Sequence, residues 1–179
     1  FIDVNDLNYV ASTYSPEQLV KDILINGGST CTTANVTNVT VSPDHGVDNE
    51  TRFWGYFNKG TATFPFTDGI VLTTGHARDA GNGFIGLLSK TIGTGSDPDL
   101  VAATNPIVEL KDAVALEFDF VPNSTQVKFN YIFASEEYDS DFPCTGGFSD
   151  AFALLLKKVG DPTYTNLAIL PGGAGPVSA

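Results

Sequence analysis

The chain has 179 residues, of which 42% are apolar and 17% charged, so a sizeable core can form and disorder is not expected. Its 21 acidic and 9 basic residues give a formal charge of −12, which makes nucleic acid a poor candidate partner. No apolar run approaches the length of a membrane span. The chain begins at Phe1 and contains no Met, which indicates a mature or excised segment whose signal peptide, if it had one, is gone.

Residues 1–14 predict an extended arm, or an edge strand with a bulge at residues 5–6. The apolar side chains of the arm alternate and then shift by one position: Ile2, Val4, Leu7 and Tyr9. A short helix is predicted next, because Ser15 is a good N-cap, Pro16 suits the first helical position, and Gln18 completes a capping box. Its apolar stripe runs through residues 19–24, and Gly27-Gly28 ends it.

The rest of the chain predicts β structure. The expected strands are 36–42, 52–58, 70–74, 114–121, 126–134, 151–157 and 166–170. Strands 114–121 and 126–134 alternate apolar and polar residues on either side of a short turn, which favours a hairpin. Thirteen Phe residues supply a core between two sheets, and residues 78–106 are expected to form long loops. The predicted fold is all-β: a two-sheet antiparallel, jelly-roll-like β-sandwich with one peripheral N-terminal helix.

Catalysis has little support in the sequence. The two histidines, His45 and His76, lie in loop-like segments, where solvated residues are the simpler interpretation, and no known catalytic or phosphate-binding motif is present. Glu136 and Glu137 are adjacent carboxylates, but neighbours on a strand point to opposite faces and do not flank one sugar. We therefore expect no enzyme.

An acidic cluster follows strand 126–134. Because its carboxylates repel one another, either a bound cation neutralises them or they form a solvated rim. Calcium accepts such irregularly spaced oxygen ligands, although the spacing of an EF-hand is missing. The candidate calcium ligands, which include a second acidic stretch, are Glu136, Glu137, Asp139, Asp141, Asp150, Asp97 and Asp99.

Two features point to an oxidising, extracellular compartment. Cys31 and Cys144 are too far apart for a CxxC motif, and a disulfide between them would contribute about 4–5 kcal/mol; two buried free thiols are the alternative. Four N-glycosylation motifs are present, at Asn35, Asn38, Asn49 and Asn123. Asn35 and Asn38 would point to opposite faces of one strand, so Asn49 and Asn123 are the better acceptors.

The segment 131–138 (YIFASEEY), followed by 148–152 (FSDAF), resembles the signature of the choice-of-anchor L domain. Further matching segments keep the family's order: 18–24, 35–40, 69–75, 97–100, 115–122 and 166–171. The resemblance covers roughly residues 16–178 and implies a β-rich module of secreted or surface proteins of bacteria, with no catalytic role to transfer. N-glycosylation is far from assured in a bacterial protein.

In this family the sequence usually continues past the equivalent of residues 176–178 into further strand-like segments. Either this chain is a fragment, or the domain at 15–179 is short of its last strands; in the second case it would leave an open apolar groove. The arm, residues 1–14, would fill that groove in the next subunit by strand addition and build a head-to-tail homopolymer. An ordinary N-terminal edge strand in its own sheet is the equally weighted alternative.

The leading hypothesis is thus a non-enzymatic extracellular or cell-surface module, structural or adhesive, that forms a surface fibre. The alternative is a calcium-dependent module that binds carbohydrate or another ligand. In that case Trp54, Tyr56 or Tyr138 would stack on a sugar, although alternation within a strand favours packing for the first two.

Overall fold

A computed structural model divides into two compact units. Unit 1 comprises Phe1–Ile92 and Val114–Lys128, and unit 2 comprises Gly93–Ala113 and Phe129–Ala179. The structure describes residues 1–25, 35–44, 48–86, 88, 90–91, 93–104, 110–123, 125–135 and 150–178. Within these residues, no helix combines the length and the apolar character that crossing a membrane requires.

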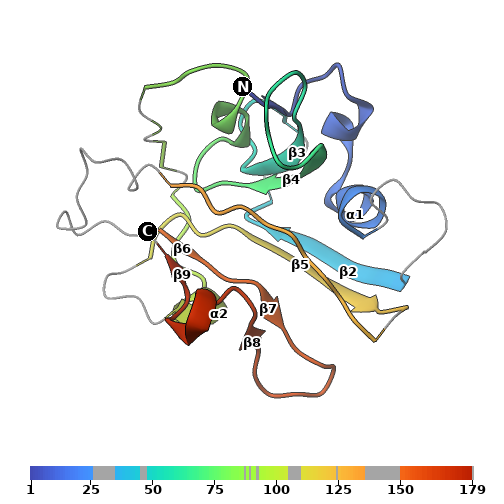
Figure 1. Ribbon diagram of the computed structural model, residues 1–179, viewed down its shortest axis with the longest axis vertical. Helices are drawn as coiled ribbons and strands as arrows, with labels where there is room; N and C mark the ends of the chain where they lie inside the picture. Colours follow the sequence, from blue (N-terminus) through green and yellow to red (C-terminus); the bar gives the residue numbers. More distant parts are fainter. Residues whose placement is uncertain are drawn as a thin grey trace. The chain divides into compact units, whose positions relative to one another are not determined.

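The first sheet of unit 1 has three antiparallel strands in the order β1-β3-β4 (Figure 1). Strand β1 (Asp3–Val4) pairs with β3 (Trp54–Asn58), which also pairs with β4 (Asp68–Leu72). The arm is therefore an edge strand of its own sheet. This is the second of the two alternatives that the sequence left open, and it pairs Asp3 with Asn58 and Val4 with Phe57, more than fifty positions away.

The second sheet of unit 1 is a two-stranded antiparallel ribbon of β2 (Asn35–Ser42) and β5 (Ala115–Val121). Its register shifts between Thr37 and Thr40, where Asn38 has a φ of 53°. The predicted hairpin is wrong, because β5 pairs with β2 and residues 126–134 form no strand. Alternation gave the faces of β5 correctly, but it does not specify a partner strand.

The predicted N-terminal helix begins as expected. Ser15 Oγ accepts a hydrogen bond from the Gln18 N–H at 3.2 Å, and Gln18 Oε1 accepts one from the Ser15 N–H at 3.0 Å, which completes the capping box. Helix α1 (Pro16–Gln18) continues directly as the π-helix η2 (Leu19–Ile25).

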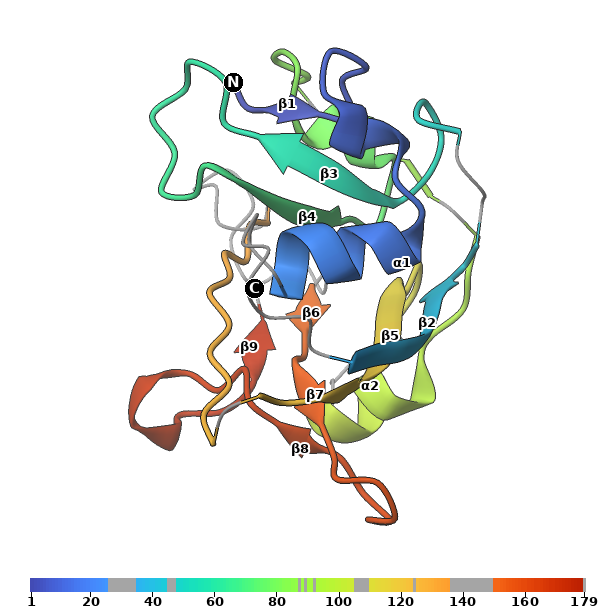
Figure 2. The same cartoon turned by 90° about the vertical axis from the view of Figure 1, so that its right-hand side faces the viewer.

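This helix is not peripheral, contrary to the sequence prediction. Leu19 is 1% exposed and Val20 is fully buried. Figure 2 shows α1 lying between the β3–β4 pair and the β2–β5 ribbon of unit 1. Leu19 joins one core cluster with Val41, Trp54 and Tyr56. The apolar stripe is thus covered by both sheets.

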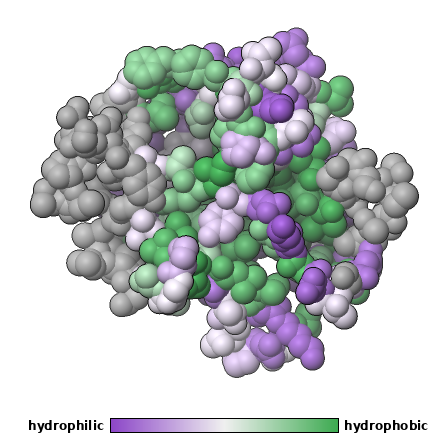
Figure 3. Space-filling view, viewed as in Figure 1, coloured by the Kyte–Doolittle hydropathy of each residue, from purple (hydrophilic) through white to green (hydrophobic). Residues whose placement is uncertain are grey.

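A second core cluster lies beneath β1 and contains Val4, Phe57 and Ala77. Among the described phenylalanines, only Phe53 and Phe57 are buried, and Phe84 is 82% exposed. The expectation that the Phe residues as a group fill the core is therefore wrong. Figure 3 accordingly shows green apolar residues at several places on the face that it displays.

Two short 3₁₀ helices complete the framework of unit 1. Helix η1 (Val10–Thr13) lies within the predicted arm, where an extended chain was expected, and brings Ser12 into the interior. Helix η3 (Ala77–Ala80) follows β4, and its first residue, Ala77, is fully buried. Both helices position polar groups of the site described below.

Unit 2 contains short elements only. They are α2 (Pro98–Thr104), β6 (Ala151–Phe152), β7 (Leu155–Leu156), β8 (Thr165–Asn166), the 3₁₀ helix η5 (Pro171–Gly173) and β9 (Val177–Ser178). Strand β6 pairs with β9, and β7 pairs with β8, both antiparallel. Helix α2 lies where the sequence predicted only long loops.

The described elements are mostly antiparallel strands with few short helices, which agrees with an all-β class. The sandwich or jelly-roll arrangement of two complete sheets stays a prediction.

Candidate functional site

A fully buried arginine lies at the centre of unit 1. Arg52 Nη2 donates to Asn5 Oδ1 at 2.7 Å and to the Ser12 carbonyl oxygen at 2.8 Å. Its guanidinium carbon lies 4.3 Å from the ring centroid of Trp54, a cation–π contact. Burial lowers the pKa of Arg52 from 12.5 to about 10, whereas the negative charge of Asp48 acts to raise it.

Asn5 directly follows β1, and its side chain forms hydrogen bonds with the backbone of β3. Its Nδ2 donates to the Trp54 carbonyl at 3.2 Å, and its Oδ1 accepts from the Tyr56 N–H at 3.2 Å. The backbone φ of 50° turns the chain away from the strand there, at the position where the sequence predicted a bulge. An asparagine tolerates this left-handed conformation better than most residues. Asn5 therefore links β1, β3 and the buried Arg52.

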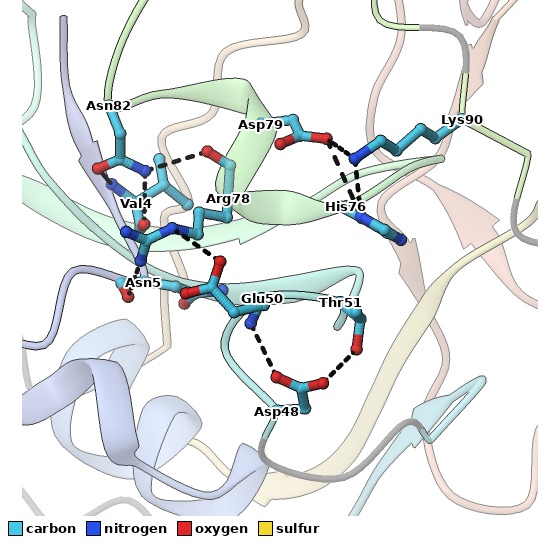
Figure 4. A network of polar contacts seen from close by, with 10 residues as sticks. All are labelled: Val4, Asn5, Asp48, Glu50, Thr51, His76, Arg78, Asp79, Asn82 and Lys90. Atoms are coloured by element: carbon cyan, nitrogen blue, oxygen red, sulfur yellow. Dashed lines mark hydrogen bonds and ion pairs between the residues drawn. The ribbon is translucent and has the colours of Figure 1, made fainter.

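Asn82 holds the opposite edge of β1 (Figure 4). Its Oδ1 accepts from the Val4 N–H at 3.1 Å, and its Nδ2 donates to the Val4 carbonyl at 2.9 Å and to the Arg78 carbonyl at 3.0 Å. The Asn82 N–H also donates to the Ile2 carbonyl at 2.8 Å. Strand β1 is thus hydrogen-bonded along both edges, by β3 on one side and by Asn82 on the other.

We call the hydrogen bonds of Asn82 to Ile2, Val4 and Arg78 the clamp, and ion pairs lie around it. Arg78 Nη1 donates to the Asn5 carbonyl at 3.1 Å, and Arg78 Nε lies 3.3 Å from Glu50 Oε2. Lys90 Nζ lies 2.8 Å from Asp79 Oδ2 and 3.2 Å from His76 Nδ1. Because an ammonium group only donates, His76 Nδ1 is the acceptor in this contact.

The sequence suggested that His76 is a solvated loop residue, but the structure places it against other side chains. Its ring stacks on Phe53 with centroids 6.1 Å apart, and its side chain is 26% exposed. No serine or cysteine nucleophile contacts His76 among the contacts of the described residues. The charged groups of this site therefore bind one another and the chain's own backbone. The arrangement fixes the N-terminal segment in place.

Asp48 closes a tight turn beside the site. Its carboxylate accepts from Thr51 Oγ1 at 2.7 Å and from the Glu50 N–H at 3.0 Å, and these two bonds lower its pKa from 3.8, the Thr51 bond most. A carboxyl group with a lowered folded-state pKa stabilises the fold above its unfolded pKa. That contribution is lost as the pH falls through the folded value.

We predict that Thr51→Val raises the pKa of Asp48 back toward 3.8, because the largest cause of the lowering disappears. NMR titration of the Asp48 carboxyl carbon between pH 2 and 6 measures it. Thr13→Val serves as the matched control, since the Thr13 hydroxyl donates to Val10 and not to Asp48. An unchanged Asp48 midpoint in Thr51→Val would contradict the assignment.

The four arm residues divide between core and surface. Val4 is fully buried, Ile2 packs against the same cluster, and Tyr9 packs against the cluster around Trp54. The Tyr9 hydroxyl also donates to Asp3 Oδ2 at 2.8 Å, which raises the pKa of Tyr9. Leu7 is 69% exposed. The arm thus packs against its own unit.

The calcium candidates are only partly described. Glu136, Glu137, Asp139 and Asp141 lie outside the described residues. Asp97 Oδ1 accepts from the Leu100 N–H at 2.8 Å near the start of α2, and Asp150 Oδ2 accepts from the Ser135 hydroxyl at 2.7 Å. Asp99 is exposed in the first turn of α2. Within the described part of the chain, no three acidic, histidine or cysteine residues gather around one point.

Calcium binding stays a prediction that a chelator tests. If calcium binds the folded chain, EDTA removes about 2–3 kcal/mol of stability at saturating metal and lowers the melting temperature. Excess magnesium is the control for a nonspecific charge effect. Asp97→Asn should leave the chelator effect unchanged, because Asp97 is used as a helix cap. Identical melting curves with and without EDTA would remove calcium from consideration.

The glycosylation candidates differ in their surroundings. Asn35 and Asn123 are exposed. The Asn38 amide donates to Asp119 Oδ2 at 2.6 Å, and the Asn49 side-chain oxygen is buried. The irregularity at residues 37–40 leaves both Asn35 and Asn38 exposed, contrary to the opposite faces expected for a regular strand. Cys31, Cys144, His45 and Tyr138 lie outside the described residues, so the disulfide stays a prediction.

Trp54 and Tyr56 do not form a sugar-stacking surface. They are 1% and 5% exposed and belong to the core, which was the simpler interpretation of their alternation. The central residues of the site, Asn5, Arg52 and Asn82, were not predicted. One available signal was the position of Arg52 in the predicted strand 52–58, because residues two apart share a face and Arg52 therefore lies on the same face as Trp54 and Tyr56.

The comparison with known proteins rests on one family. No curated protein and no solved structure matches the chain at a significant level. The model of the choice-of-anchor L domain matches residues 4–179, which includes Val4 of β1 and residues 4–14 of the predicted arm. The chain therefore belongs to the choice-of-anchor L family.

Proposed function

We propose that this domain is a non-catalytic structural and adhesive module of a secreted or cell-surface bacterial protein. Membership of the choice-of-anchor L family supports the compartment. The polar site supports the non-catalytic role, because its charged groups are used to hold β1 against its own sheet. A non-catalytic adhesive module binds its partner through exposed side chains on one of its faces.

The outer face of the β2–β5 ribbon is the proposed contact surface. Val36 and Val41 are buried on one side, whereas the other side exposes hydroxyl, amide and carboxylate groups. Thr37 lies opposite Asp119, and Thr40 lies opposite Glu117. The exposed residues of this face are Asn35, Thr37, Asn38, Thr40, Ser42, Glu117 and Asp119.

Such a face suits a polyhydroxylated surface such as a glycan. Carboxylates accept hydrogen bonds, hydroxyls donate and accept them, and side chains on neighbouring strands present these groups at close, regular spacing. Because Trp54 and Tyr56 are buried, the proposed recognition depends on polar contacts and not on aromatic stacking by these residues.

Adhesion of chain-coated beads to immobilised glycans tests this proposal. We expect binding that falls several-fold in Glu117→Gln/Asp119→Asn, which removes charge while keeping shape. Glu17→Gln is the matched control, since Glu17 is an exposed carboxylate on α1. Equal binding by all three chains would exclude this face, and turnover of the glycan would replace the non-catalytic assignment.

The fibre hypothesis receives less support. Strand addition in trans would require β1 to leave β3 and Asn82, and Val4 to leave its own core. Size-exclusion chromatography of the intact chain with and without residues 1–5 tests it. Assembly that disappears with the deletion would favour exchange of β1 between copies.

A further inference from the structure

The segment that clamps β1 contains a chemically reactive pair. Asn82 is followed by Gly83, and both the residue and its surroundings are accessible: Asn82 is exposed, and a Cβ built on Gly83 would meet nothing within 4 Å. In an Asn-Gly pair, the unhindered glycine nitrogen attacks the asparagine side-chain carbonyl more readily than the nitrogen of any bulkier residue does. Within the described part of the chain, the Gly83 N–H makes no hydrogen bond.

The same asparagine amide holds β1 in place. Its Nδ2 donates to the carbonyl oxygens of Val4 and Arg78, and its Oδ1 accepts from the Val4 N–H (Figure 4). While these three bonds hold, the amide is kept against β1 and cannot rotate freely toward the following nitrogen. The backbone at Asn82 is also held in the left-handed region, with a φ of 64°. Cyclisation therefore requires the clamp to open first.

We propose that Asn82 is a site of spontaneous deamidation that is gated by β1, and that its modification releases the outer edge of β1. The Gly83 nitrogen loses its proton and bonds to Asn82 Cγ, and the Cγ–Nδ2 bond breaks to release ammonia. Water then opens the resulting succinimide at either carbonyl and gives aspartate or isoaspartate. No other reagent is needed.

The product no longer fits the clamp. Where Nδ2 donated to two carbonyl oxygens, a carboxylate oxygen now faces the same two acceptors, so both hydrogen bonds are lost and repulsion replaces them. In isoaspartate the backbone is also longer by one carbon after the Cα of residue 82, and a free α-carboxylate takes the place of the backbone carbonyl. On its outer edge, strand β1 then keeps only bonds to N–H donors, such as that of Val4, and the Val4 carbonyl oxygen repels the carboxylate that replaces its donor.

Gly81 provides a way to open the clamp without changing the reacting pair. A Cβ on Gly81 would lie 2.6 Å from the Ile2 carbonyl oxygen and 2.6 Å from Val4 Cγ2, so Gly81→Ala pushes β1 away. Gly83→Ala is the chemical control, because its Cβ has open space in the fold but hinders attack by the residue-83 nitrogen.

The experiment incubates the intact wild-type, Gly81→Ala and Gly83→Ala chains at mildly alkaline pH and follows Asn82 by peptide mass spectrometry. Urea-denatured wild type gives the ungated rate, and the peptide with the other Asn-Gly pair, Asn26-Gly27, is quantified separately. We expect folded wild type to react several-fold more slowly than denatured chain, Gly81→Ala to approach the denatured rate, and Gly83→Ala to react slowest.

The rate of amide hydrogen exchange at Val4 measures whether deamidation releases the outer edge of β1. We expect faster exchange in deamidated wild type than in unmodified wild type. If Gly81→Ala does not fold, urea titrated below the unfolding midpoint opens β1 instead, and the rate at Asn82 should rise with it. Equal rates in folded and denatured wild type, or unchanged exchange after deamidation, would overturn the proposal.

Discussion

Gly55→Ala is expected to destabilise the chain by about 4 kcal/mol, an effect at the upper end for a single substitution. A Cβ at position 55 would lie 1.8 Å from Asn5 Oδ1 and 2.5 Å from Asn5 Cγ. Asn5 is fully buried and cannot rotate aside without losing its bonds to Trp54, Tyr56 and Arg52. The cost is therefore overpacking together with a buried cation that loses an acceptor. Urea denaturation measures it.

A double-mutant cycle separates this cause from a general intolerance of β3. Asn5→Gly removes the side chain that the new methyl group would strike and keeps a residue that accepts a φ of 50°. Adding Gly55→Ala to Asn5→Gly should therefore cost less than about 1 kcal/mol, far below its effect alone. Gly83→Ala, whose Cβ meets nothing, should change stability by less than about 0.5 kcal/mol. Additive effects at positions 5 and 55 would show that the clash is not the cause.

Local signals predicted the parts of the fold that depend on neighbouring residues. The capping box at Ser15 and Gln18 formed as expected, because both partners lie within one turn. Strands β2 to β5 were found within a few residues, since their alternation is a local property. The overlooked helix α2 also had a local signal, a proline at its first position preceded by Asp97.

The site was not predictable in the same way. Asn5 and Arg52 are 47 positions apart, and Val4 and Asn82 are 78 positions apart, so no local pattern connects them. From the sequence, Asn5 lies in a predicted bulge and Asn82 in a predicted long loop, and neither position indicates a partner. These residues meet their partners because β1 pairs with β3 in the folded chain. The same limit explains why β5 was paired with residues 126–134 and not with β2.

Arg52→Met is expected to cost about 3 kcal/mol, although it removes a buried charge. The lowering of the Arg52 pKa from 12.5 to about 10 corresponds to a burial penalty of about 3 kcal/mol, which methionine avoids. Against this stand two charge-assisted hydrogen bonds, about 2 kcal/mol each, and a buried cation–π contact of about 2 kcal/mol. These favourable terms sum to about 6 kcal/mol. Arg52 Nε and Nη1 have no hydrogen-bond partner among the described residues and reduce this sum, but methionine would leave the buried Ser12 carbonyl oxygen without its Arg52 donor, which costs a similar amount, so a net loss of about 3 kcal/mol is expected.

Arg52→Lys distinguishes the shape of the guanidinium from its charge. A lysine keeps the positive charge but cannot lie flat on Trp54 while donating to both Asn5 and Ser12, so we expect it to be no more stable than Arg52→Met. Near-ultraviolet circular dichroism should show a changed Trp54 signal in both variants, since this is the chain's single tryptophan. If Arg52→Met proved as stable as wild type, the burial penalty would equal the energy of the contacts, and the expectation would be wrong. The buried arginine would then act in positioning β1 and not in stabilising the fold.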